Sequence, residues 1–255
     1  MKGGPSVTQG NTSHSPSQRA HERSPERPAI HAVSGYQAIV DYLRREISLG
    51  RIMPGDRLPA ERKLAEEYGV ARETLRQALR ILEGSGQIVI QRGAAGGPVV
   101  QALSLDPEAM LRELRDRRDS IMELIEFRSV VEPAAAGLAA ERRGETELQS
   151  MADAQADLQA STTRDEFRRA DTAFHLAVAD AARNPMLEQA IEEARSLMFL
   201  PTDLVPYDFV KDSSYTAHEH VLNAIRAGDR EAAVAAMAAH IGVTREEFVR
   251  VIVGA

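Results

Sequence analysis

The chain has 255 residues, enough for two domains that each bury a hydrophobic core, and a formal net charge of −7. It contains no cysteine, which excludes disulfides, thiolate metal sites and cysteine nucleophiles. No apolar run is long enough to span a membrane, and no signal-peptide core begins the chain, so we expect a cytoplasmic protein without a membrane partner.

The charge is distributed unevenly. Residues 1–33 are rich in Ser, Pro, Gly, His and Arg and have no hydrophobic period, which predicts a disordered tail. Residues 34–100 hold 10 basic and 8 acidic side chains, whereas residues 101–255 hold 17 and 28. A mildly basic module followed by an acidic body is typical of a DNA-binding domain fused to a regulatory domain.

Three helices and a hairpin are predicted in the basic module. Residues 36–49 form an amphipathic pattern that ends at Gly50, and residues 60–68 and 70–82 form two more, separated by Gly69. The last of these has an apolar stripe opposite an arginine-rich face. Short β-rich runs at 88–90 and 99–100 enclose a glycine-rich loop, as in a winged helix-turn-helix. An ordinary pair of amphipathic helices with solvated arginines is the alternative.

A specific resemblance favours the first interpretation. The residues Leu58-Pro59-x-Glu61-Arg62-x-Leu64-Ala65, then Gly69-Val70-x-Arg72-x-x-Leu75-Arg76-x-Ala78-Leu79-x-x-Leu82, resemble the winged-helix signature of the GntR family of transcription regulators. The resemblance implies a homodimer on double-stranded operator DNA with an inverted repeat. The predicted DNA-contacting residues are Arg62, Arg72, Glu73, Thr74, Arg76, Gly93, Gly96 and Gly97. Ala71 departs from the serine or threonine usual in the family, so the recognition helix lacks an N-cap hydroxyl.

The rest of the chain is predicted to be all-α. Helical patterns cover residues 107–119, 120–142, 145–160, 163–182, 185–200, 209–227 and 229–253, so the fold class is mainly α, with an antiparallel bundle of six or seven helices after the winged helix. The predicted domains are a tail (1–33), a DNA-binding domain (34–101), a linker and first helix (102–119), and a helical effector-binding, metal-binding and dimerisation domain (120–255).

Four inward-facing side chains suggest a metal site in this bundle. Asp171 and His175 lie four residues apart on one apolar stripe, and the periods around His218 and His240 turn both inward, whereas His220 faces solvent. Imidazole nitrogens and a carboxylate suit zinc, nickel or manganese. The alternative is that each histidine is a hydrogen-bonded core residue.

A second resemblance bears on this cluster. Asp171-x-x-Phe174-His175, then His218 ahead of Ile225-x-x-Gly228-Asp229, and Met237-x-x-His240 resemble the FadR-type C-terminal domain of one GntR branch. The resemblance implies that these Asp and His positions bind the metal, which helps to hold a small organic acid. Arg128, and less strongly Arg195, are candidates for pairing with the effector carboxylate. A salt bridge with Glu132 is the alternative for Arg128.

The sequence therefore predicts a ligand-responsive repressor, released from its operator when a small carboxylate draws the ligand-bearing helices together. Because the domains are expected to join only through residues 102–119, this movement would change the spacing of the paired winged helices. Two other functions compete: a metal-dependent, hydrolase-like enzyme that uses the Asp/His3 site, and a constitutive DNA-architectural protein.

Overall fold

A computed structural model describes residues 1, 3–4, 35–91, 96–102, 107–198 and 207–253. The chain divides into two units, residues 1–33 and residues 34–255, and the elements described below all belong to the second unit. The predicted disordered tail lies almost wholly outside the described residues, as do Gly93 in the wing and the break predicted at 201–206.

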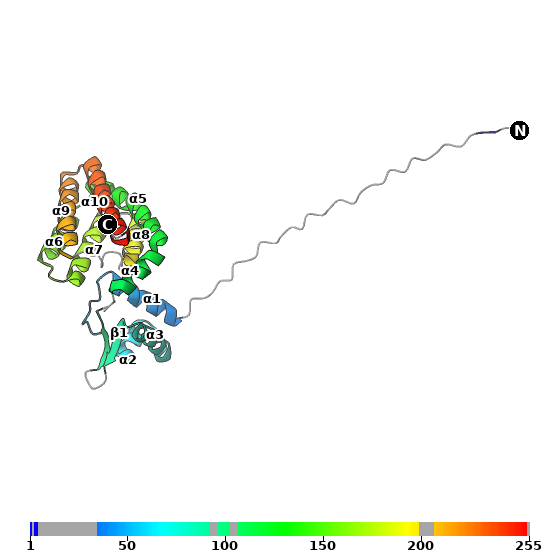
Figure 1. Cartoon of the computed structure of the whole chain (residues 1–255), viewed down its shortest axis with the longest axis horizontal. Coiled ribbons are helices and arrows are strands. Elements are labelled where there is room, and N and C mark those ends of the chain that lie inside the picture. The colour runs from blue at the N-terminus through cyan, green and yellow to red at the C-terminus, as the bar shows by residue number, and fades with distance from the viewer. Residues whose placement is uncertain (2, 5–34, 92–95, 103–106, 199–206, 254–255) are drawn as a thin grey trace. The chain divides into compact units, whose positions relative to one another are not determined.

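Three helices and a hairpin make up the first part of the larger unit (Figure 1). The helices are α1 (Gly35–Ser48), α2 (Glu61–Glu67) and α3 (Arg72–Gly84). Strands β1 (Ile88–Gln91) and β2 (Gly97–Val100) pair antiparallel, with Ile88 opposite Val100 and Gln91 opposite Gly97. Gly69 takes a φ of +64° between α2 and α3, a conformation that glycine adopts without strain.

The predicted apolar stripes form the core of this part. Buried side chains of α1 meet those of α3, and Ile88 and Val100 of the hairpin cover them. The stripe residues are Ile39, Val40, Leu43 and Ile47 on α1 and Leu75, Ala78, Leu79 and Leu82 on α3. This burial leaves the opposite face of α3, with its arginines, turned away from the core.

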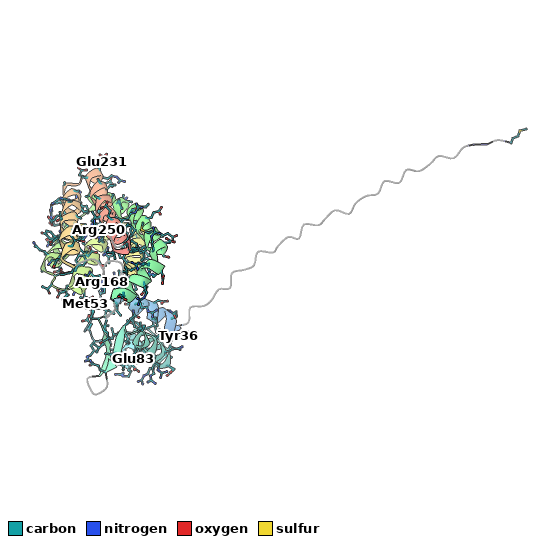
Figure 2. The ribbon with its side chains drawn as sticks, in the orientation of Figure 1. Tyr36, Met53, Glu83, Arg168, Glu231 and Arg250 are labelled. Carbon is teal, nitrogen blue, oxygen red and sulfur yellow. The ribbon has the colours of Figure 1, made fainter. Side chains whose placement is uncertain are left out.

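The second part consists, in the described ranges, of seven helices (Figure 1). They are α4 (Pro107–Asp116), α5 (Arg118–Arg142), α6 (Glu145–Ala160), α7 (Arg164–Ala181), α8 (Pro185–Leu197), α9 (Tyr207–Ala227) and α10 (Arg230–Val253). Helix α10 packs along α5 and α9, and α6 packs on α7 and α9. Glu231 and Arg250 mark the two ends of α10 (Figure 2). The predicted fold class is confirmed.

Local signals set the ends of the two helices that matter most for the site. Helix α7 begins with a capping box, in which the Thr163 hydroxyl accepts from the Glu166 N–H and the Glu166 carboxylate accepts from the Thr163 N–H. Helix α8 begins at Pro185, and Asn184 is its N-cap residue. The Asn184 side-chain oxygen accepts hydrogen bonds from two backbone N–H groups of the first turn. Most predicted helix ends differ from the observed ones by no more than three residues.

The winged helix and the helical bundle also touch outside the linker, which contradicts the prediction that residues 102–119 alone join them. Arg45 of α1 pairs with Glu192 and Glu193 of α8, and Arg51 pairs with Glu192 at 2.5 Å. At Gly50, where φ is +70°, a β-carbon would come within 2.9 Å of the Arg169 Cα on α7. Local sequence periods carry no information about such contacts.

Candidate metal and effector site

The four predicted metal ligands meet inside the bundle. Asp171 and His175 lie on α7, His218 on α9 and His240 on α10, and all four are buried. One ligand atom from each lies within 4.8 Å of the others. The Nε2 atoms of His175 and His240 are 3.1 Å apart, and His218 Nε2 lies 3.5 Å from Asp171 Oδ1. Neighbouring donors around one zinc ion, with bonds of about 2.1 Å, are separated by about 3.0–3.5 Å, so these pairs fit an ion.

The hydrogen bonding of His218 supports a metal more than a structural role. Both of its ring nitrogens are buried and have no hydrogen-bond partner among the described residues. A core histidine in a settled hydrogen-bond network would not leave both nitrogens unpaired, because each unmet polar group costs about 1–3 kcal/mol. The Phe174 ring stacks on the imidazole at 4.0 Å and 7°, which holds its orientation. His220 is exposed, as predicted.

A carboxylate outside the predicted ligand set orients His175. Glu132 Oε2 lies 2.5 Å from His175 Nδ1, and Glu132 Oε1 accepts from Arg128 Nε at 2.5 Å. A carboxylate on Nδ1 keeps the proton there and leaves the Nε2 lone pair for a metal. The predicted alternative for Arg128, a salt bridge with Glu132, is therefore present.

Burial and charge set the protonation of the cluster for cation binding. Burial lowers the pKa of His175, lowers that of His218 well below its usual value and lowers that of His240 to about 3. Burial alone would raise the pKa of Asp171, but the nearby Arg195 and histidines outweigh it, so this pKa falls below its ordinary value. At neutral pH the donors are thus neutral imidazoles and an ionised carboxylate, which are the forms that bind zinc, nickel or manganese.

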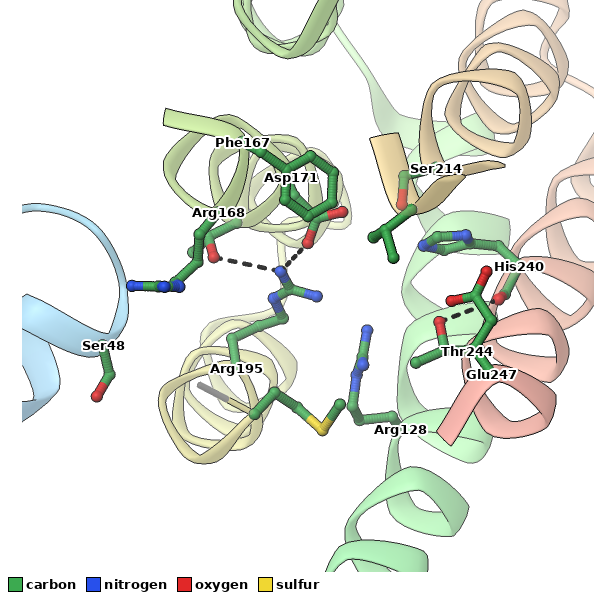
Figure 3. Close-up of a pocket in the computed structure, with 13 residues that line it drawn as sticks. Ser48, Arg128, Phe167, Arg168, Asp171, Arg195, Ser214, His240, Thr244 and Glu247 are labelled. Carbon is green, nitrogen blue, oxygen red and sulfur yellow. Dashed lines mark hydrogen bonds and ion pairs between the residues drawn. The ribbon is translucent and has the colours of Figure 1, made fainter. Parts of the chain in front are cut away.

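Three arginines, Arg128, Arg168 and Arg195, border the same cavity, whose volume is about 40 Å³ (Figure 3). Arg195 of α8 donates to the Asp171 carboxylate and to the Thr172 hydroxyl. Its Nε, and the Nη2 of Arg128, are buried without a hydrogen-bond partner among the described residues. Both predicted effector-binding residues therefore line the cavity, and each has one N–H donor that no described residue accepts from.

The charges of these side chains favour an anion once a metal is bound. The positive charges of the three arginines are balanced by Glu132, Asp165 and Asp171, and the histidines are neutral. A divalent ion would then leave two uncompensated positive charges beside the unused guanidinium N–H groups. A carboxylate satisfies both requirements, because it accepts hydrogen bonds from guanidinium and binds metals.

Sequence periods alone did not identify several cavity-lining residues. The structure adds side chains of α7, α9 and α10 to the lining, namely Thr172, Ser214, Thr244 and Glu247. Two of them follow His240 by four and seven residues, so helical spacing from the predicted ligand would have placed them on its face. Ser214 likewise precedes His218 by four residues.

The predicted DNA-contacting side chains mostly lie on the surface of α2 and α3. Arg72 and Glu73 are exposed at the start of α3, whose N-cap residue, Ala71, offers no side-chain hydrogen bond. Arg76 lies 3.5 Å from Glu61, and Arg62 pairs with Glu66 at 3.1 Å. Exposed pairs of this kind contribute at most about 1 kcal/mol, so phosphate groups would displace them easily.

The remaining predicted contacts are less open or lie at the wing. Thr74 is half-buried, and its Cγ2 is 3.3 Å from where a β-carbon on Gly35 would lie. Gly97 begins β2 and Gly96 precedes it, while Gly93 lies outside the described residues.

A winged helix with an arginine-bearing recognition helix, followed by a helical bundle with a buried polar cavity, defines the class of two-domain DNA-binding regulators. Comparison with known families agrees. Residues 35–96 match the model of the bacterial regulatory proteins of the gntR family, and residues 123–243 match the FCD domain. The chain belongs to the GntR family of transcription regulators and carries its FadR-like C-terminal domain.

Relatives and solved structures support this placement. The chain is 32% identical over 204 residues to the HTH-type transcriptional regulator LutR of Bacillus subtilis, covering 76% of this chain and 92% of the relative. It is also 32% identical over 202 residues to the galactonate operon transcriptional repressor of Escherichia coli, with 76% and 88% covered. The structure of E. coli McbR/YncC shares the fold, with a TM-score of 0.54 and 19% identity over 86% of this chain and 98% of that one.

These matches decide between the predicted classes of function. The matching domains and relatives are transcription regulators, so the protein is not an enzyme, and the hydrolase alternative is wrong. In the described part of the chain, no helix is long and apolar enough to cross a membrane.

Proposed function

We propose that this protein represses a metabolic operon and leaves its operator when a small carboxylate binds at a metal ion in the helical domain. The observation that carries the proposal is the meeting of Asp171, His175, His218 and His240 within 4.8 Å, next to two arginines with unused donors. Zinc, nickel or manganese fits the donor set. The ion would supply positive charge and open coordination positions for the effector carboxylate.

Each predicted domain would have a separate role. Residues 34–101 would bind DNA, residues 102–119 would link, and residues 120–255 would bind metal and effector and form the dimer. Arg62, Arg72 and Arg76 would contact phosphate or guanine, with Glu73, Thr74 and the glycines of the wing beside them. A repressor must reach operator DNA, so the proposed function implies a cytoplasmic protein.

A second copy of the chain is the proposed partner. Large apolar side chains are exposed on α5 (Phe127 and Val130) and on α8 (Met186 and Leu197), two helices that pack against each other. Exposed apolar side chains on two helices that pack against each other suit an interface between copies. Such a dimer, of about 56 kDa or twice the 27.9 kDa chain, would present two recognition helices to an inverted repeat.

Helix α8 offers a route from the cavity to the DNA-binding domain. Arg195 on this helix contacts Asp171 in the cavity, while Glu192 and Glu193 pair with Arg45 and Arg51 near α1. An effector that takes over Arg195 would shift α8, and with it the acidic pair that holds the winged helix. Coupling of this kind is reciprocal, so operator DNA should weaken effector binding by the same factor.

The test combines three measurements on the full chain. An operator is selected from random DNA, its binding is followed by fluorescence anisotropy with zinc-loaded and zinc-free protein, and small carboxylates are then added. We expect one divalent ion per chain and release by a carboxylate only when the ion is present. Operator binding that no carboxylate changes, or a protein that holds no ion after dialysis against zinc, nickel and manganese, would refute the proposal.

Assembly is measured separately by light scattering. Val130→Glu should convert the dimer to a monomer, while Gln159→Glu, a change at an exposed position on α6, should leave it unchanged. A wild-type protein that stays monomeric at micromolar concentration, with and without DNA, would contradict the dimer.

A further inference from the structure

Glu247 places a second acidic group in the cavity, across from the arginines. It follows His240 by seven residues on α10 and lines the same cavity as Arg128 and Arg195. In Figure 3 its carboxylate lies on the α10 side, beside His240, while the Arg195 guanidinium lies on the opposite side with Asp171. Neither the metal ligands nor the predicted carboxylate-binding arginines account for this residue.

One oxygen of the Glu247 carboxylate is a buried hydrogen-bond acceptor without a donor among the described residues. The Ser213 hydroxyl donates to the Glu247 side chain, yet Glu247 Oε1 is buried and has no partner among the described residues. A buried acceptor without a donor costs free energy, which a ligand recovers when it brings the donor.

The charge of Glu247 limits what the cavity accepts. The pairs Arg128–Glu132, Arg168–Asp165 and Arg195–Asp171 are each neutral, so a bound divalent ion adds two positive charges, and an ionised Glu247 reduces them to one. One carboxylate neutralises this remainder. A second carboxylate on the ligand would face Glu247, and two like charges in contact repel strongly away from bulk water.

The other lining groups agree with a small, hydroxylated ligand. Thr172, Ser214 and Thr244 bring hydroxyl groups to the cavity. Its volume of about 40 Å³ holds only a few water-sized groups. The cavity walls therefore offer both hydrogen-bond donors and acceptors, and the cavity is too small for a ligand with a long carbon chain.

We propose that Glu247 determines effector specificity: it accepts a hydrogen bond from a hydroxyl group of a short monocarboxylate and excludes dicarboxylates. The arginines and the metal hold the ligand carboxylate at the other side. This inference rests on the proposed function, because it assumes that the cavity binds a carboxylate beside a divalent ion.

The test uses three-carbon ligands that differ in one group. Zinc-loaded full-length protein is titrated calorimetrically with lactate, propionate, malonate and alanine. We expect the wild type to bind lactate about tenfold to hundredfold more tightly than propionate, the value of a hydrogen bond to a charged acceptor. Malonate should bind at least about tenfold more weakly than lactate.

Two substitutions separate the roles of charge and acceptor. Glu247→Gln keeps a hydrogen-bond acceptor but removes the negative charge. The affinity for malonate should therefore rise at least about tenfold, while lactate should still bind more tightly than propionate. Glu247→Ala removes both, so lactate and propionate should bind alike. Glu246→Gln, the same change at the neighbouring exposed position, is the matched control and should leave the wild-type order unchanged.

The failures of the two proposals are distinguishable. If zinc and carboxylates bind but the Glu247 variants rank the ligands as the wild type does, the inference is wrong and the proposed function stands. If alanine binds more tightly than lactate, the donor is an ammonium group and the hydroxyl assignment is overturned. A wild type that binds zinc and none of these acids overturns the inference, and the proposed function falls as well if no other carboxylate changes operator binding.

Discussion

Replacing His218 tests the metal site directly, because the structure separates the role of this side chain in metal binding from its role in the fold. His218 makes no hydrogen bond to the described residues that its removal would break, and its ring stacks on Phe174. His218→Ala should therefore leave Asp171 paired with Arg195 and cost only packing, on the order of 2–4 kcal/mol of unfolding free energy. Each variant is consequently compared with its own zinc-free form.

The expected effect on zinc binding follows from ligand loss. Changes outside the ligand set typically weaken metal binding about 10–100-fold, so loss of one of four donors should cost at least about 100-fold. At zinc concentrations about 100 times the wild-type Kd, bound zinc stabilises the wild type by about 2.7 kcal/mol, or roughly 5–11 °C in Tm. The variant, then near its own Kd, should gain only about 0.4 kcal/mol, or about 1–2 °C.

The assay is thermal unfolding after chelation, with and without added zinc, alongside operator binding. His220→Ala is the matched control, since His220 lies on the same helix two residues away and is exposed. The control should keep the full zinc shift and the effector response, whereas His218→Ala should lose both and still bind operator DNA. Equal zinc shifts in the two variants, or none in the wild type, would show that the four residues do not form a metal site.

Three further predictions follow from the same structure. Arg72→Ala or Arg76→Ala should each weaken operator binding by at least about 1–3 kcal/mol in fluorescence anisotropy, with Tm unchanged, because neither side chain belongs to the core. Glu132→Gln should weaken zinc binding about 10–100-fold in competition with a chromophoric chelator, since His175 loses the carboxylate on its Nδ1. In zinc-free protein, the pKa of His240 lies at about 3 in the folded state and 6.5 in the unfolded state, so the unfolded state binds more protons between these values. Its contribution to the free energy of unfolding is therefore complete above pH 6.5 and should fall as the pH drops toward 3, which urea titrations at several pH values will measure.

The sequence was sufficient to predict the side of each helix on which the site residues lie. The four-residue spacing of Asp171 and His175, and the apolar positions after His218, are local properties that a helix converts directly into a face. The same periodicity correctly predicted that His218 faces the core and His220 faces solvent. Helix types were predictable for the same reason, because each apolar stripe repeats with the helical period over several turns.

Contacts between helices could not be read in this way. Nothing local indicates that Glu132 reaches His175, or that Arg195 pairs with Asp171 across 24 residues of sequence, because a period gives the direction of a side chain and not its partner. The contacts of Arg45 and Arg51 with α8 were missed for the same reason. Glu247 is an exception, because it follows His240 by seven residues and helical spacing alone places both on one face of α10.

The close approach at Gly50 has a consequence for engineering sensors from this protein. Because a β-carbon at Gly50 would meet the backbone of Arg169, two residues from Asp171, the turn after α1 is shaped to fit the surface of α7. A chimera that grafts a foreign winged helix onto this bundle at residue 101 would discard that fit together with Arg45 and Arg51. We expect such a chimera to bind both its DNA and its ligand without communicating between them. Transplanting α1 and the following turn along with the bundle, and exchanging only α2, α3 and the hairpin, keeps the contact intact.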